Sequence, residues 1–146
     1  MRPVLHVAAA ARTRADGSLA SAVVLQWDGN GARRVMTRAQ QKGQLIGVSY
    51  RAVVQGLMEA RRLRARAVII YVDDAQVVAH LHGTERPPVE ILGLYLQVRA
   101  LMNAFRSADV RLSAAPARHE PIFAAAAALP ARGHAYADLP LWAAAS

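Results

Sequence analysis

One segment, residues 65–72 (ARAVIIYV), constrains the fold of this chain more than any other. Apart from one arginine it is continuously apolar, which is typical of a central strand covered on both faces of a sheet. The residues before it, 48–63, place apolar side chains on one stripe of a helix. The residues after it, 74–82, have the pattern of a short helix that Gly83 would end. A helix, a central strand and a second helix therefore follow one another.

Three strand-like segments come before this unit. They are residues 3–11, 19–27 and 32–39. The last two are joined by DGNG at 28–31, where Asp-Gly and Asn-Gly supply the positive φ that a hairpin turn needs. These segments predict an antiparallel meander, and residues 40–47 are predicted to be a loop leading to the first helix.

The rest of the chain alternates helix and strand. After a loop at 84–90 we expect a helix at 91–105, a strand at 109–115 and a last helix at 120–129. The fold class is α/β, with a five-stranded mixed sheet of three antiparallel strands and then two parallel ones, and helices on both faces. We expect one domain over residues 1–130 and a tail, 131–146, that packs on the domain or is flexible.

The chain is strongly basic and contains no cysteine. Its 146 residues carry a formal charge of +8, from 18 basic and 10 acidic side chains, and Lys42 is the one lysine among the basic residues. A basic surface attracts nucleic acid or an anionic membrane, although a GC-rich genome would also produce so much arginine and alanine. The absence of cysteine excludes disulfides, zinc–thiolate sites and thiol catalysis, and a reducing cytoplasm is the expected location.

The first fifteen residues, MRPVLHVAAAARTRA, have the order of charges and apolar residues of a signal peptide. Their apolar run is short and His6 interrupts it, so we interpret it as the first strand. No apolar run in the sequence is long enough to cross a bilayer, and no membrane partner is expected.

Two motifs occupy residues 49–83. The first, on the predicted helix, consists of Tyr50, Ala52, Gly56, Leu57 and Ala60. The second, after the central strand, consists of Asp73, Val77, Leu81 and Gly83. In their order and spacing they resemble the type 1 ribonuclease H family, in particular its short branch related to the reverse-transcriptase-associated domain. The resemblance covers roughly residues 3–129, and it implies a ribonuclease H-like fold.

The resemblance also implies where an active site would lie. Members of the family hold two divalent ions with four carboxylates, and the ions activate water and stabilise the leaving oxygen of an RNA phosphodiester. In this chain the four positions fall at Ala9, Ser49, Asp73 and Ala125. One of the four is an acid, so we expect the fold to persist without the hydrolytic site. Asp73 remains the candidate metal ligand, and no cofactor is expected unless a rebuilt site binds Mg²⁺ or Mn²⁺.

The surface that would contact a hybrid is altered as well. Leu45 and Ile46 stand where the resemblance implies asparagines that contact the minor groove. Arginines and one lysine near the same edge of the sheet are candidates for an anion-binding rim that contacts phosphates directly. These residues are Arg12, Arg14, Lys42, Arg51 and Arg118.

Three other features have simpler interpretations. Asp74 is predicted to cap the helix that follows it, with Asp73 an inherited remnant, because aspartate accepts backbone N–H bonds at helix starts. His80 and His82 are two positions apart on a helix and point apart, so they are interpreted as surface or sheet-adjacent polar residues and not as a metal pair. His119 and Glu120 are interpreted as loop residues near the start of the last helix.

Three hypotheses follow for the function. The first is a catalytically degenerate ribonuclease H-like domain that binds RNA or an RNA–DNA hybrid. The second is a protein-interaction or dimerisation module that uses Leu45 and Ile46 or the tail. The third is an active ribonuclease whose metal site is rebuilt from Asp73, Asp74 and Glu120.

Overall fold

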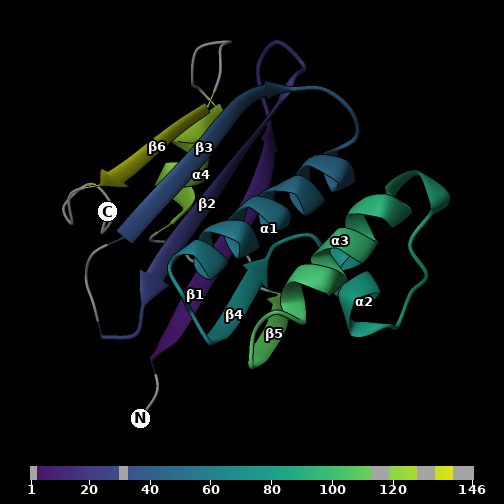
Figure 1. Ribbon diagram of the computed structural model, residues 1–146. Helices are drawn as coiled ribbons and strands as arrows, with labels where there is room; N and C mark the ends of the chain where they lie inside the picture. Colours follow the sequence, from purple (N-terminus) through teal and green to yellow (C-terminus); the bar gives the residue numbers. More distant parts are fainter. Residues whose placement is uncertain (1–2, 30–32, 113–118, 128–133, 140–146) are drawn as a thin grey trace.

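The computed structural model describes residues 3–29, 33–112, 119–127 and 134–139. Within these residues one six-stranded sheet runs in the order β5-β4-β1-β2-β3-β6 (Figure 1). The strands are β1 (Val4–Thr13), β2 (Leu19–Trp27), β3 (Arg33–Gln41), β4 (Ala67–Val72), β5 (Ser107–Leu112) and β6 (His134–Leu139). The helices are α1 (Leu45–Arg62), α2 (Ala75–His82), the short 3₁₀ turn η1 (Val89–Ile91), α3 (Leu92–Met102) and α4 (Glu120–Ala127).

β1 lies inside the sheet, between β4 and β2. β1 is antiparallel to β2 and parallel to β4, and Ala9 lies opposite Val23 on one side and Val72 on the other. β3 is antiparallel to β2, and β5 is parallel to β4. The predicted arrangement of three antiparallel and two parallel strands is therefore confirmed. Because β1 and β4 run in the same direction, Arg12 and Asp73 emerge at the same edge.

α1 covers one face of the sheet and forms most of the core with it. Tyr50, Val53 and Leu57 are fully buried against the strands. Gly56 allows this close approach, because a Cβ atom there would stand 2.6 Å from a methyl carbon of Val7 and 2.9 Å from one of Val23. The expected core face of the helix is therefore the one that contacts the sheet.

α4 covers part of the opposite face, as Figure 1 shows behind the sheet. Ile122 and Phe123 are buried there against the small side chains of Ala8, Ala10 and Ala22. Because these strand residues are alanines, the backbone of a helix can approach the sheet closely. Helices thus lie on both faces, as predicted.

Both ends of α2 follow the expected residue chemistry. A carboxylate oxygen of Asp74 accepts hydrogen bonds from the backbone N–H groups of Gln76, at 2.9 Å, and Val77, at 3.3 Å. Gly83 ends the helix with a φ of 80°, a conformation that a residue with a side chain rarely adopts. The interpretation of Asp74 as a helix cap is confirmed.

Several predicted boundaries differ from the observed ones; for example, α3 ends at Met102 and not at 105, and β5 begins at Ser107 and not at 109. Residues 45–47 belong to α1 and not to a loop, because Ile46 packs against the core although Gly43 and Gly47 weaken the helical pattern around it. β1 extends to Thr13, so Arg12 belongs to a strand and not to the following loop. β6 pairs antiparallel with β3 and adds a sixth strand. In the described part of the chain, no helix is both long and apolar enough to span a membrane.

Candidate functional site

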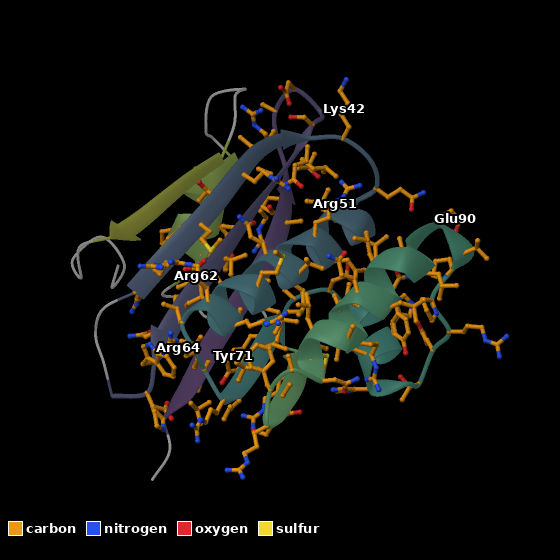
Figure 2. All side chains as sticks on the ribbon, in the orientation of Figure 1. Lys42, Arg51, Arg62, Arg64, Tyr71 and Glu90 are labelled. Atoms are coloured by element: carbon orange, nitrogen blue, oxygen red, sulfur yellow. The ribbon has the colours of Figure 1, made fainter. Side chains whose placement is uncertain are left out.

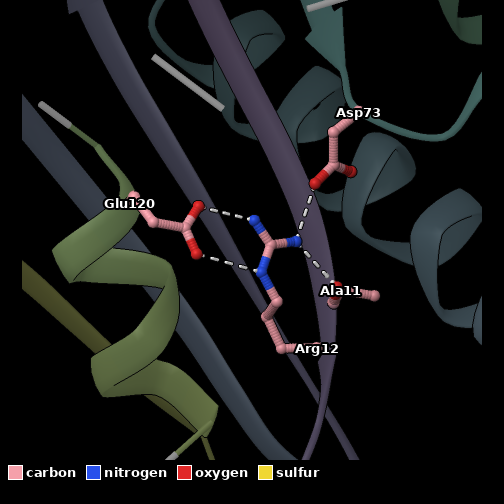
Figure 3. Close-up of polar contacts among 4 residues, drawn as sticks. All are labelled: Ala11, Arg12, Asp73 and Glu120. Carbon is pink, nitrogen blue, oxygen red and sulfur yellow. Dashed lines mark hydrogen bonds and ion pairs between the residues drawn. The ribbon is translucent and has the colours of Figure 1, made fainter. Parts of the chain in front are cut away.

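Three elements meet around the guanidinium of Arg12 near the end of β1 (Figure 3). Its Nη1 donates to a carboxylate oxygen of Asp73, just after β4, at 2.7 Å and to the carbonyl of Ala11 at 2.9 Å. On the other side its Nη2 and Nε donate to the two carboxylate oxygens of Glu120, the first residue of α4, at 2.8 and 3.4 Å. The guanidinium therefore joins carboxylates of two elements that lie far apart in sequence.

The environment keeps Arg12 charged. Burial by itself would lower its pKa, but the hydrogen bond to Glu120 and the charge of Asp73 outweigh burial, and the pKa is raised above its ordinary value. The guanidinium also lies over the ring of Phe123, 5.4 Å from the ring centre, a favourable cation–π contact. Arg12 is thus a fixed positive charge within the site.

An open pocket of about 500 Å³ adjoins this ion-pair cluster. It lies between the ends of β1 and β4 and the start of α1 and is lined by Ala11, Arg12, Thr13, Leu45, Ser49, Asp73, Asp74 and Ala75. Ser49, near the start of α1, is buried, with 3% of its surface exposed. With Asp74 in its wall and Glu120 next to it, this region holds more carboxylates than cations.

The structure brings together two of the four positions at which the family resemblance implies a carboxylate. Ser49 and Asp73 line the same pocket. Ala9 is buried two residues deeper in the core, and the β1 residues that line the pocket are Ala11, Arg12 and Thr13. Ala125 lies on the exposed side of α4, and the α4 residue that reaches the site, through Arg12, is Glu120.

The predicted anion-binding rim is only partly present. Arg12 uses its nitrogens on Asp73, Glu120 and Ala11, as described above. Arg14 is largely buried, donates to the carbonyl of Ala127 at 3.1 Å and forms an ion pair with Asp16 at 3.6 Å. These two arginines are engaged within the protein.

The other cations of that rim differ. Lys42 and Arg51 are exposed and adjacent, since a guanidinium nitrogen of Arg51 donates to the Lys42 carbonyl at 3.3 Å. Figure 2 shows both near the beginning of α1, with Arg62 and Arg64 at its other end. Arg118 lies outside the described residues.

The histidines have structural surroundings. His80 was interpreted as a surface or a sheet-adjacent polar residue; it is buried, so it is not on the surface, and its Nδ1 lies 2.8 Å from the hydroxyl of Tyr50. Burial raises the pKa of Tyr50, so the hydroxyl keeps its proton. The Nε2 of His82 lies 2.6 Å from the Val110 carbonyl of β5. His119 is buried and packs edge-on against Phe123.

The described residues contain no group of three or more histidine or acidic side chains placed to hold a metal ion. Asp73 and Glu120 are the two carboxylates that face each other across the site, and the guanidinium of Arg12 stands between them (Figure 3). The sequence showed which acids are missing, but not this internal cation. The one feature of the sequence that could have indicated this cation is Arg12 itself, which lies close to Ala9, the position of the first missing acid.

Comparisons with known proteins agree with the fold. A family model described as reverse transcriptase-like matches residues 7–115. No curated protein matches the chain. The ribonuclease H1 of the archaeon Halobacterium salinarum NRC-1 has a similar structure, with a TM-score of 0.66 at 18% identity, over 75% of this chain and 85% of that chain.

Two further solved structures are similar. The N-terminal RNase H domain of a Mycobacterium tuberculosis protein has a TM-score of 0.68 at 20% identity, over 86% of this chain and 96% of that chain. LC11-RNase H1, solved in complex with an RNA/DNA hybrid, has a TM-score of 0.63 at 11% identity, over 77% of this chain and 85% of that chain. At these identities the likeness establishes the fold. With the family match over most of its length, the chain belongs to the reverse transcriptase-like family and has the ribonuclease H-like fold.

Proposed function

We propose that this ribonuclease H-like domain binds nucleic acid, either RNA or an RNA–DNA hybrid, without hydrolysing it. The observation that carries the proposal is the position of the Arg12 guanidinium between Asp73 and Glu120. Two-metal hydrolysis needs divalent ions that bind the attacking and leaving oxygens. A guanidinium fixed between the two carboxylates offsets one of their two negative charges and occupies the space between them in which such an ion would bind.

The same arrangement argues against a phosphate bound directly by Arg12. A guanidinium has five N–H donors, and four of those of Arg12 already point to Asp73, Glu120 and Ala11. It therefore cannot offer a second two-pronged face to a phosphate. The carboxylates around the pocket would also repel one. Phosphate contacts are better assigned to the exposed cations beside the pocket.

Lys42 and Arg51 are the best placed of these cations. Thr13 pairs with Leu19, and Leu19 pairs with Gln41, so the turn that holds Lys42 leaves the sheet at the same edge as the end of β1. A basic surface next to a degenerate catalytic pocket can bind a polyanion by releasing its counterions. The structural neighbour solved with an RNA/DNA hybrid supports nucleic acid as the class of partner.

A binding titration tests this assignment. The anisotropy of a labelled RNA–DNA hybrid and of single-stranded RNA is followed at several salt concentrations with the unaltered chain. We expect affinity to fall with salt, and the double substitution Lys42→Ala, Arg51→Ala to reduce the log–log slope by about one per lost phosphate contact. The control is Arg64→Ala, Arg66→Ala, which removes the same charge from exposed residues at the other end of α1 and β4. Equal losses in both variants would contradict a localised surface, and a slope near zero would leave the protein-interaction hypothesis.

Hydrolysis is tested separately with the same labelled hybrid in Mg²⁺ or Mn²⁺. We expect no cleavage above the buffer control. Cleavage that disappears in Asp73→Asn would refute the proposal in favour of a rebuilt nuclease site. Cleavage that persists in Asp73→Asn would point to a contaminating nuclease, and the assay would then be repeated with independently purified protein.

A further inference from the structure

The pocket beside Arg12 is lined by carboxylates that have hydrogen-bonding capacity to spare. Asp73 uses one oxygen on Arg12, and Figure 3 shows its other oxygen turned away from that guanidinium. Asp74 uses one oxygen to cap α2. Both side chains line the pocket of about 500 Å³ described above. Among the described residues, no hydrogen-bond donor contacts the second oxygen of either carboxylate.

Ser49 adds a buried hydroxyl to the same pocket. This residue is 3% exposed and lines the pocket from α1. Its hydroxyl has no hydrogen-bond partner within the part of the chain that the structure describes. A polar side chain buried to this extent is normally hydrogen-bonded, and α1 could hold an alanine here instead. A ligand that enters the pocket would supply the missing partner.

The charge around the pocket favours a cation. Asp73, Asp74 and Glu120 are acidic, and Arg12 is the cation that lies among them. The negative charge therefore exceeds the positive charge, although the positive end of α2 offsets part of the charge of Asp74. The formal +8 of the whole chain opposes a cation at long range, but charges farther away than about 8 Å are largely screened at physiological salt. The carboxylates at the pocket thus determine the sign of the ligand.

The acceptors distinguish between kinds of cation. A guanidinium pairs best with both oxygens of one carboxylate, but Asp73 and Asp74 each have one oxygen left. Mg²⁺ needs about six oxygen ligands, and the described residues hold no group of three or more acidic or histidine side chains suited to a metal ion. A primary ammonium has three N–H donors, and the two aspartates and Ser49 supply one acceptor for each.

We propose that this pocket binds a primary ammonium group carried on an alkyl chain. Asp73, Asp74 and Ser49 accept its N–H donors. Leu45 lines the same pocket and is 46% exposed, so it offers an apolar contact to the methylene groups next to the nitrogen. Two sources share this chemistry, namely a free alkyl diamine and the lysine side chain of another protein.

A titration of the full chain with n-butylammonium, followed by two-dimensional NMR of the backbone amides, tests the site. We expect saturable shifts at Ser49, Asp74 and Ala75 with a Kd of about 1–10 mM, as suits so small a ligand. At constant ionic strength, n-butanol, which lacks the charge, and tetramethylammonium, which lacks N–H donors, should give no saturable shift at these amides. Equal binding of tetramethylammonium, or no saturable shift with n-butylammonium up to about 50 mM, would overturn the proposal.

Substitutions locate the ligand. Asp74→Asn removes a charge but keeps a good helix cap, and Ser49→Ala removes the hydroxyl and keeps a good helix former. We expect n-butylammonium binding to weaken about tenfold in Asp74→Asn and about threefold in Ser49→Ala, with both variants folded by circular dichroism. Glu85→Gln is the matched control, since it removes the same charge from an exposed residue outside the pocket and should bind like the unaltered chain. Unchanged binding in both pocket variants, or equal weakening in Glu85→Gln, would contradict the assignment.

Two further ligands identify the source of the ammonium group. Tighter binding of 1,4-diaminobutane than of n-butylammonium would indicate a free diamine, whereas tighter binding of a blocked Gly-Lys-Gly peptide would indicate a lysine side chain. Either result supports an ammonium site. These titrations contain no nucleic acid, and Lys42 and Arg51 are not among the residues that line the pocket, so their failure would leave the proposed nucleic-acid binding untouched.

Discussion

Removing the guanidinium of Arg12 is the sharpest perturbation that the structure suggests. Arg12→Met keeps an unbranched apolar stem over Phe123 but removes the charge and the hydrogen bonds. The matched control is Arg12→Lys, which keeps the charge but cannot bridge two carboxylates with one planar group. We expect both variants to fold, with Arg12→Lys intermediate in stability between Arg12→Met and the unaltered chain.

The expected loss can be estimated from exposure. The side chains of Arg12 and Asp73 are 26% and 23% exposed, so this pair is partly screened and is assigned about 1.5 kcal/mol, the low end for hydrogen bonds to charged groups. Glu120 is 50% exposed, and its pair with Arg12 contributes about 0.5 kcal/mol. The sum of about 2 kcal/mol corresponds to a fall in Tm of about 4–8 °C for a chain of this size. Thermal unfolding at pH 7, followed by circular dichroism, measures it.

Stabilisation by divalent cations is a second test of the Arg12→Met variant. In Arg12→Met the carboxylates of Asp73 and Glu120 face each other without a counter-ion, and a cation that bound them with a Kd of about 1 mM would add about 1.4 kcal/mol at 10 mM Mn²⁺. The unaltered chain should gain nothing comparable, because its own guanidinium holds that position. If Arg12→Met were as stable as the unaltered chain, or if Mn²⁺ stabilised both equally, the idea of an internal cation would be refuted.

Two further predictions concern the packing and charge of α1. Gly56→Ala should destabilise the domain by about 2 kcal/mol, because the added methyl meets branched side chains of the sheet. Gly47 has open space around it, so Gly47→Ala should stabilise α1 by about 0.5–1 kcal/mol. Urea unfolding of both variants measures the difference. The pKa of Glu59 is lowered, first by its hydrogen bond to Arg62 and also by that to Arg34. The contribution of Glu59 to stability is therefore present above the ordinary pKa of 4.5, and it disappears as the pH falls through the lower folded-state pKa. The stability difference between the unaltered chain and Glu59→Gln should therefore be largest near pH 7 and shrink in acid, and a difference independent of pH would contradict this account.

The parts of the fold that were predictable depend on local chemistry. The cap at Asp74, the end of α2 at Gly83 and the buried strand β4 are each fixed by a few neighbouring residues. The start of α1 at Leu45 was missed because two glycines obscure a helix that is stabilised by packing of Ile46.

The functional site was less predictable because it is assembled from distant segments. Arg12 and Glu120 are 108 positions apart, and no periodic pattern links them. The sequence indicated an anion-binding role for Arg12, but the structure brings two carboxylates to it and uses most of its donors. Likewise the sequence left His80 either at the surface or next to the sheet, because its neighbour in the fold, Tyr50, lies 30 positions earlier in the chain.

The pairing of β6 with β3 also determines which strand lies at this border of the sheet. A strand at the border of a sheet presents unpaired N–H and C=O groups to any extended chain that approaches it. β6 covers residues 33–38 of β3 and becomes the border strand in its place, so a strand of six residues instead of one of nine presents unpaired groups to an approaching chain. A version shortened to residues 1–130 would retain the five strands first predicted, but the longer strand β3 would then lie at the border, and this version should aggregate more readily than the full chain.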